Sequence, residues 1–150
     1  MFRMIRRTRE RGAALVEFAV VLPLFVVLIF GVMEAGWLFA QQVEIRNAAR
    51  EGARLAVVDW GTAAAVAGET CNRADLSGAG ATVTVTPSST IDSEFDPPSP
   101  ESVTVSVTKT YNSLTGVLDF FDNLQMAATA EMRTERPLTN LGGSSSAVCP

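Results

Sequence analysis

The sequence predicts an α+β protein in which a long N-terminal transmembrane helix continues into a small exported domain with a three-stranded antiparallel sheet. Three features predict this arrangement. A short basic leader precedes a long apolar segment, a helical pattern of small residues and arginines continues past it, and three later segments alternate apolar with polar residues. The length of 150 residues favours one domain rather than two.

The charge of the chain is divided unevenly. Residues 1–12 hold five arginines and one glutamate, a local charge of +4, so the formal net charge of −4 leaves −8 for the rest. A basic head beside an apolar segment indicates a membrane contact, and it holds the N-terminus in the cytoplasm. The acidic body argues against nucleic acid as a partner, because phosphates repel carboxylates.

Residues 13–40 form the predicted transmembrane helix. The uncharged segment between Glu17 and Glu34 spans roughly 24 Å as a helix, a little short of a hydrocarbon core of about 30 Å. Continuing through Ala40 gives a sufficient span and places Glu34 near the far interface. Pro23 is expected to kink the helix or loosen one turn. The body then lies in the periplasm or outside the cell, on a single-pass anchor of the inner membrane.

A cleaved secretory signal and a plain signal anchor both fit the basic start. The cleaved signal is disfavoured because Met33-Glu34-Ala35 and Leu38-Phe39-Ala40 each have a large residue at the −3 position of the cleavage site. The plain anchor leaves Glu17 unexplained. A carboxylate just inside the membrane edge is costly and usually has a partner or a function.

The junction between leader and apolar helix resembles a type IV prepilin processing site, with Gly12 followed five residues later by Glu17-Phe18. A wider set resembles the TadE-like family, the minor pilins or pseudopilins of tight-adherence (Flp-type) pilus systems. The set comprises Arg11-Gly12-Ala13-Ala14-Leu15-Val16-Glu17-Phe18-Ala19, Leu22-Pro23, Gly31, Glu34 and Asn47-Ala48-Ala49-Arg50-Glu51-Gly52-Ala53-Arg54. This resemblance covers residues 11–58, and Ala130–Arg133 resembles the closing strand of the family.

The resemblance implies cleavage between Gly12 and Ala13 by a membrane aspartyl prepilin peptidase. It also implies that Glu17 pairs with the free amine of a neighbouring subunit during assembly. The implied partners are this peptidase, other pilin or pseudopilin subunits and the Tad assembly platform, and the implied role is structural. A filament subunit, an assembly factor and a tip adhesin all fit. The alternative is an uncleaved single-pass anchor that displays a binding or scaffold domain of the cell envelope.

An amphipathic extension of the helix is predicted over residues 41–60. Arg46, Arg50 and Arg54 recur every four residues on one face, and small residues occupy another. The small face packs on the sheet of the same chain, or it contacts another subunit. Within the membrane, two small-x-x-x-small pairs permit close helix packing. They are Gly31 with Ala35 and Gly36 with Ala40.

Residues 61–150 are predicted to form the exported, β-rich domain. Alternation of β-branched or small apolar residues with polar ones predicts strands near 82–86, 102–108 and 126–133. Cys71 and Cys149 form a candidate disulfide, since export allows oxidation. The tail from Gly142 is expected to be flexible up to Cys149.

Two long segments connect the predicted strands. The acidic, proline-rich stretch from Pro87 to Glu101 is read as a solvated loop rather than a calcium site, because it lacks the glycine and closing glutamate of an EF-hand. The apolar segment from Asn112 to Leu124 either caps the core or contacts a partner or a membrane surface. With no histidine and no phosphate-binding loop, we expect neither an enzyme, a metal site nor a cofactor.

Overall fold

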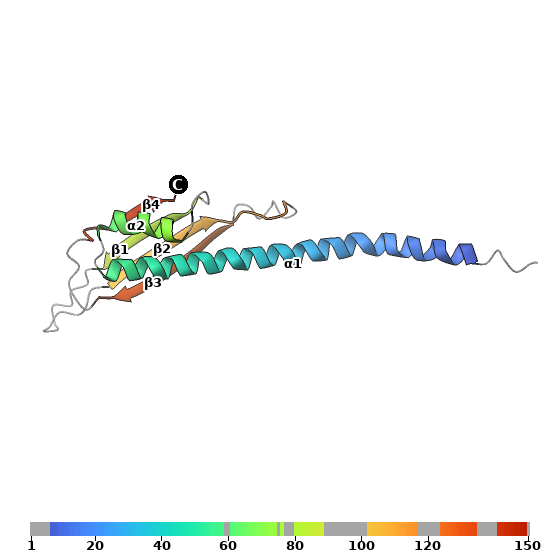
Figure 1. Cartoon of the computed structure of the whole chain (residues 1–150), viewed down its shortest axis with the longest axis horizontal. Helices are drawn as coiled ribbons and strands as arrows, with labels where there is room; N and C mark the ends of the chain where they lie inside the picture. Colours follow the sequence, from blue (N-terminus) through green and yellow to red (C-terminus); the bar gives the residue numbers. More distant parts are fainter. Residues whose placement is uncertain are drawn as a thin grey trace, which may run out of the picture.

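The computed structural model describes residues 7–58, 61–74, 76, 80–88, 102–116, 124–134 and 141–149. Their elements, in chain order, are α1 (Arg7–Val57), α2 (Ala63–Arg73), β1 (Thr82–Ser88), β2 (Ser102–Thr110), β3 (Gln125–Arg133) and β4 (Ser145–Val148). Figure 1 shows α1 extending far beyond the sheet, which packs only along the C-terminal part of the helix. The fold is therefore α+β, with a small body at one end of a long rod.

The helix α1 is continuous over 51 residues, with Pro23 inside it. At about 1.5 Å per residue its length is roughly 75 Å. It ends at Val57, three residues before the limit predicted for the amphipathic extension. Among the described residues, α1 from Gly12 is the one helix long and apolar enough to cross a membrane, judged by length and composition.

The sheet is antiparallel, with strand order β3-β2-β1-β4. The three predicted strands form the meander β1-β2-β3, but the predicted number of three was wrong. The fourth strand, β4, comes from the tail that was expected to be flexible, and it pairs with the free edge of β1. Its polar sequence has no apolar alternation to mark it as a strand. Pairing with an exposed strand edge supplies the backbone hydrogen bonds that hold it.

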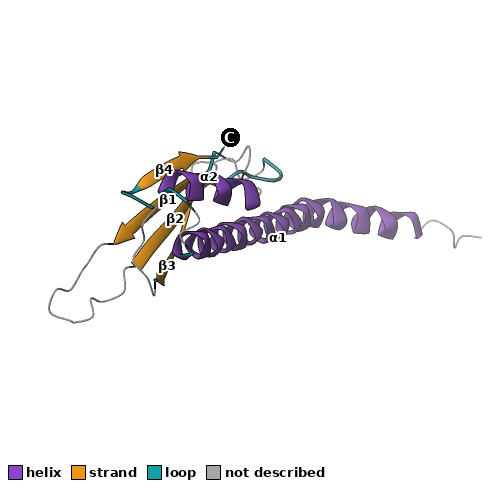
Figure 2. Cartoon of the chain, turned by 60° about the vertical axis from the view of Figure 1, so that its left-hand side comes forward, coloured by secondary structure: helices purple, strands orange, loops and turns teal. Residues whose placement is uncertain are grey.

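The two helices cover one face of the sheet, as Figure 2 shows. α1 packs on β2 and β3, whereas α2 packs on β1 and β4. The inward valines of the strands are fully buried beneath them, namely Val83, Val85, Val103, Val105 and Val107. Small residues on α1 let the helix approach this layer closely, among them Ala48, Ala49, Ala53 and Ala56. The apolar alternation therefore predicted the buried face of these strands correctly.

The helix α2 lies within residues 61–150, at the start of the domain that was predicted to be β-rich. Thr62 caps its N-terminus, with the backbone N–H of Ala65 donating to the Thr62 hydroxyl over 3.2 Å. Cys71 near its other end forms a disulfide with Cys149, just after β4. A bridge that closes a loop of 78 residues restricts the unfolded chain enough to stabilise the fold by roughly 4–5 kcal/mol. The disulfide thereby fastens the chain end, and β4 with it, to α2.

Gly52 marks the closest approach of α1 to the rest of the body. A Cβ atom at this position would lie 2.8 Å from the Thr70 hydroxyl oxygen and 3.0 Å from a methyl carbon of Val105. Thr70 is itself held in place, since its hydroxyl donates to the Val66 carbonyl over 2.7 Å. Only glycine fits between α2 and the sheet at this point.

Gly52→Val is expected to lower the free energy of unfolding by about 1–3 kcal/mol, because the added methyl groups overpack a fully buried contact. Gly68→Val is the matched control. It places the same side chain on a helical glycine, Gly68 of α2, that has open space around it. Thermal unfolding of the detergent-solubilised chain, followed by circular dichroism, checks this. Equal melting temperatures for the two variants would contradict the close approach at Gly52.

Candidate functional site

The N-terminal part of α1 is an apolar surface that none of the described residues of the body covers. Every side chain from Gly12 to Met33 is exposed, including large ones such as Leu24 (72% exposed) and Phe25 (56%). Between Gly12 and Met33 the single charged residue is Glu17. In water each large apolar side chain left uncovered forgoes about 1.5–3 kcal/mol of burial energy. This surface therefore requires lipid or other helices around it.

The predicted processing residues lie at the start of this surface. Gly12 and Ala13 are both exposed on α1, and no atom lies within 4 Å of a Cβ placed at Gly12. Glu17 follows about 7.5 Å further along the helix axis and is exposed as well. The structure thus places all three on one accessible segment. Residues 1–6 of the leader lie outside the described part of the chain.

The four small residues predicted to pack helices are exposed on α1 as well. Gly31, Ala35, Gly36 and Ala40 are all exposed, and a Cβ at either glycine would meet nothing within 4 Å. In the part of the body that the structure describes, nothing packs against these two glycines. Their close-packing surface is available to a partner helix.

A cluster around Glu34 ends the exposed apolar segment. Glu34 is 2% exposed, and its carboxylate accepts hydrogen bonds from the Tyr111 hydroxyl, from the Leu114 and Thr115 backbone amides (2.9 and 3.3 Å) and from the Thr115 hydroxyl (3.0 Å). A buried carboxylate is costly unless donors surround it. Hydrogen bonds to a charged group contribute about 1.5–3 kcal/mol each. We call Glu34, Tyr111, Leu114 and Thr115 the Glu34 clamp.

The same face of α1 makes further polar contacts with the chain after β2. The Trp37 indole nitrogen and the Gln41 amide nitrogen both donate to the Asn112 carbonyl oxygen, over 3.0 and 3.1 Å. Glu44 lies one helical turn after Gln41 on α1, and its carboxylate pairs with the ammonium group of Lys109, near the end of β2, over 3.0 Å. Spacings of three and four residues bring these side chains onto one stripe of the helix. The stripe joins α1 to residues 109–115 before the apolar core begins at Ile45.

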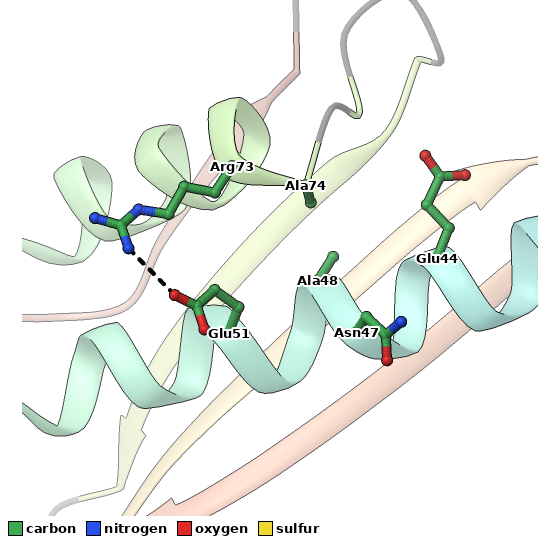
Figure 3. A pocket seen from close by; sticks show the side chains of 6 residues that line it. All are labelled: Glu44, Asn47, Ala48, Glu51, Arg73 and Ala74. Atoms are coloured by element: carbon green, nitrogen blue, oxygen red, sulfur yellow. Dashed lines mark hydrogen bonds and ion pairs between the residues drawn. The ribbon is translucent and has the colours of Figure 1, made fainter.

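A shallow cavity of about 260 Å³ lies between α1 and the end of α2. Figure 3 shows its lining side chains, which are Glu44, Asn47, Ala48, Glu51, Arg73 and Ala74. Arg73 pairs with Glu69 and with Glu51, at 2.7 and 3.2 Å. The hydrogen bond with Glu69 is the main cause of the raised pKa of the Arg73 guanidinium. The carboxylate of Glu51 already pairs with two arginines, Arg54 and Arg73. We therefore interpret the charged side chains of this cavity as a surface ion-pair network that connects α2 to α1.

Sequence reasoning found the exposed segment and the cysteine pair but not the Glu34 clamp. It placed Glu34 near the far membrane interface and gave it no partner. A signal was present: Glu34 is a lone carboxylate in an apolar stretch, and Tyr111 is the one tyrosine of the chain and directly follows a strand. Of the two connections, residues 89–101 and 117–123 lie outside the described residues.

Comparison with known proteins bears on the same region. A family model described as TadE-like protein matches residues 12–54. The N-terminal part of this chain is TadE-like. The TadE-like segment runs from Gly12 through the exposed apolar surface and Glu34 to the part of α1 that packs on the sheet. It indicates a protein related to the Tad pilus, and its apolar helix indicates a membrane anchor. The curated proteins and the solved structures gave no match.

The Glu34 clamp can be tested with Glu34→Gln. The amide side chain carries no charge and replaces one of the two acceptor oxygens with a donor, which then faces the backbone amide of either Leu114 or Thr115. Loss of one charged hydrogen bond, about 1.5–3 kcal/mol, corresponds to at least roughly tenfold faster amide exchange where that bond limits opening. Hydrogen–deuterium exchange of peptides covering residues 111–115 measures this.

Glu51→Gln is the control for that experiment, because it makes the same change on the same helix at a half-exposed ion pair. Its exchange over residues 111–115 should match that of the unmodified chain. Unchanged exchange in Glu34→Gln would show that the clamp does not hold this segment.

Proposed function

We propose that this chain is a TadE-like prepilin or pseudopilin with a structural, non-catalytic role in the assembly of a Tad (Flp-type) pilus. It is inserted in the inner membrane with its N-terminus in the cytoplasm and its body on the other side. A prepilin peptidase trims it after Gly12, so that Ala13 becomes the N-terminus. Its partners are other pilin or pseudopilin subunits and the Tad assembly platform.

The observation that carries the proposal is the exposed apolar segment with one charge. A helix that only anchors a body gains nothing from Glu17, because an ionised group at the membrane edge is costly. An amine on a neighbouring subunit would remove that cost and attract the carboxylate strongly in a low-dielectric setting. Trimming after Gly12 would supply such an amine at Ala13 of each copy. The exposed small residues from Gly31 to Ala40 support the same reading, since they allow helices to pack closely.

Processing is tested by the N-terminal peptide of the mature protein, identified by mass spectrometry from its native membrane. We expect the unmodified chain to begin at Ala13. Gly12→Val is expected to keep residues 1–12, since a branched side chain at the cleavage position obstructs the peptidase.

Gly31→Val is the matched control, because it makes the same change at another exposed glycine of α1 and should still be trimmed. Normal trimming of Gly12→Val would overturn the processing assignment. A natural start at Met1 would leave the uncleaved anchor with a binding or scaffold domain.

Assembly is tested separately with Glu17→Gln. This variant should be trimmed normally, but the association of differently tagged copies in the membrane should weaken at least about a hundredfold, since an unpaired charge in an apolar setting costs about 3–5 kcal/mol. Co-purification from mild detergent measures the loss. Glu131→Gln, on the exposed face of the body, is the control and should associate normally. Equal recovery of all three chains would remove Glu17 from assembly.

A further inference from the structure

We propose that three exposed apolar side chains at the base of the body, Trp37, Phe39 and Leu114, rest in the lipid interface on the non-cytoplasmic side of the membrane. We call them the seating rim. The partner is the bilayer surface itself, and the Glu34 clamp holds the rim in position. The inference rests on the membrane insertion of α1 in the proposed function and goes beyond it, because it assigns a lipid contact to the body.

The level of the rim along α1 is the first argument. Glu17 marks the cytoplasmic edge of the apolar segment, and Trp37 lies twenty residues further on, about 30 Å along the helix axis. A hydrocarbon core is also about 30 Å thick. Trp37 therefore lies where the helix leaves the hydrocarbon, and tryptophan is enriched at that depth.

The clamp brings a loop of the body to the same level. The Leu114 backbone amide donates to Glu34, and the Asn112 carbonyl accepts from the Trp37 indole. Figure 1 shows the chain after β2 running beyond the sheet along α1, toward the N-terminal half of the helix. Residues 111–116 are thus the described part of the body nearest to the membrane.

Exposure and polarity at this level fit lipid rather than water. Phe39 is 68% exposed, Leu114 51% and Trp37 40%. From Phe18 to Val43 the one ionisable residue of α1 is the buried Glu34, and residues 110–116 contain none except Tyr111, which is buried against it. The Trp37 indole N–H is already paired with Asn112, so its ring can lie in an apolar layer without leaving a donor unmet. The rim therefore enters the interface without desolvating a charge.

The experiment uses the full chain in phosphatidylethanolamine–phosphatidylglycerol vesicles that contain lipids brominated either near the headgroup or near the chain end. The single reporter is Leu114→Trp in a Trp37→Phe, Trp60→Phe background. Native Trp37 in a Trp60→Phe background is a second reporter that leaves the rim unchanged. We expect both to lose emission with the shallow bromolipid, to lose little with the deep one, and to be shielded from aqueous iodide.

Two further reporters calibrate depth in the same background. Phe25→Trp, in the exposed apolar segment, should be quenched by the deep bromolipid. Val58→Trp, at an exposed position directly after the C-terminal end of α1, should be quenched by iodide alone. Quenching of the rim reporters by iodide, or by neither quencher, while Phe25→Trp responds to the deep lipid, overturns the seating rim and leaves the membrane span intact. Failure of Phe25→Trp as well overturns the insertion on which the proposed function depends.

Discussion

A carboxylate that has to be buried governs how this chain is put together. Glu34 lies where the exposed apolar segment of α1 meets the body, and a charge there is tolerated only if donors surround it. The segment after β2 supplies them from one hydroxyl group, two backbone amides and a second hydroxyl. Because two of these donors are backbone amides, the clamp fixes the path of the chain after β2. The strand β2, which leads into the clamp, must therefore lie against α1 in a defined register.

That register continues down the helix as a sequence of paired positions. Contacts run from Glu34 with Thr115, through Gln41 with Asn112 and Glu44 with Lys109, to Gly52 against Val105. As the residue number rises on α1 it falls on β2, so the helix and the strand lie antiparallel. The polar pairs come first, and the small residues and valines of the core follow. Each contact pair fixes the position of the next pair along the helix. This explains how α1 packs stably on the sheet although the side chains on its inner face are mostly small.

The parts predicted from the sequence are those whose signal is local. Apolar length and charge asymmetry predict α1, and valine alternation predicts the inner strands. Two cysteines in a body that is predicted to be exported allow the bridge that the structure forms. β4 and the Glu34 clamp depend instead on partners distant in sequence. A serine-rich tail becomes a strand because β1 offers a free edge and Cys149 is bonded to α2. Glu34 finds its donors about 80 residues away, and no spacing pattern reports such a contact.

Continuity of α1 makes the body and the membrane segment one mechanical unit. Because the helix has no break between Glu17 and the clamp, the body keeps its distance from Glu17 and moves along the helix axis only together with the whole helix. In the proposed role in pilus assembly, withdrawal of the helix from the bilayer would lift the proposed seating rim off the membrane and carry the whole exposed apolar segment with it. Water cannot replace lipid around those side chains at an acceptable cost. Neighbouring helices would have to cover them during the same movement, and the exposed glycines 31 and 36 leave room for a helix to do so.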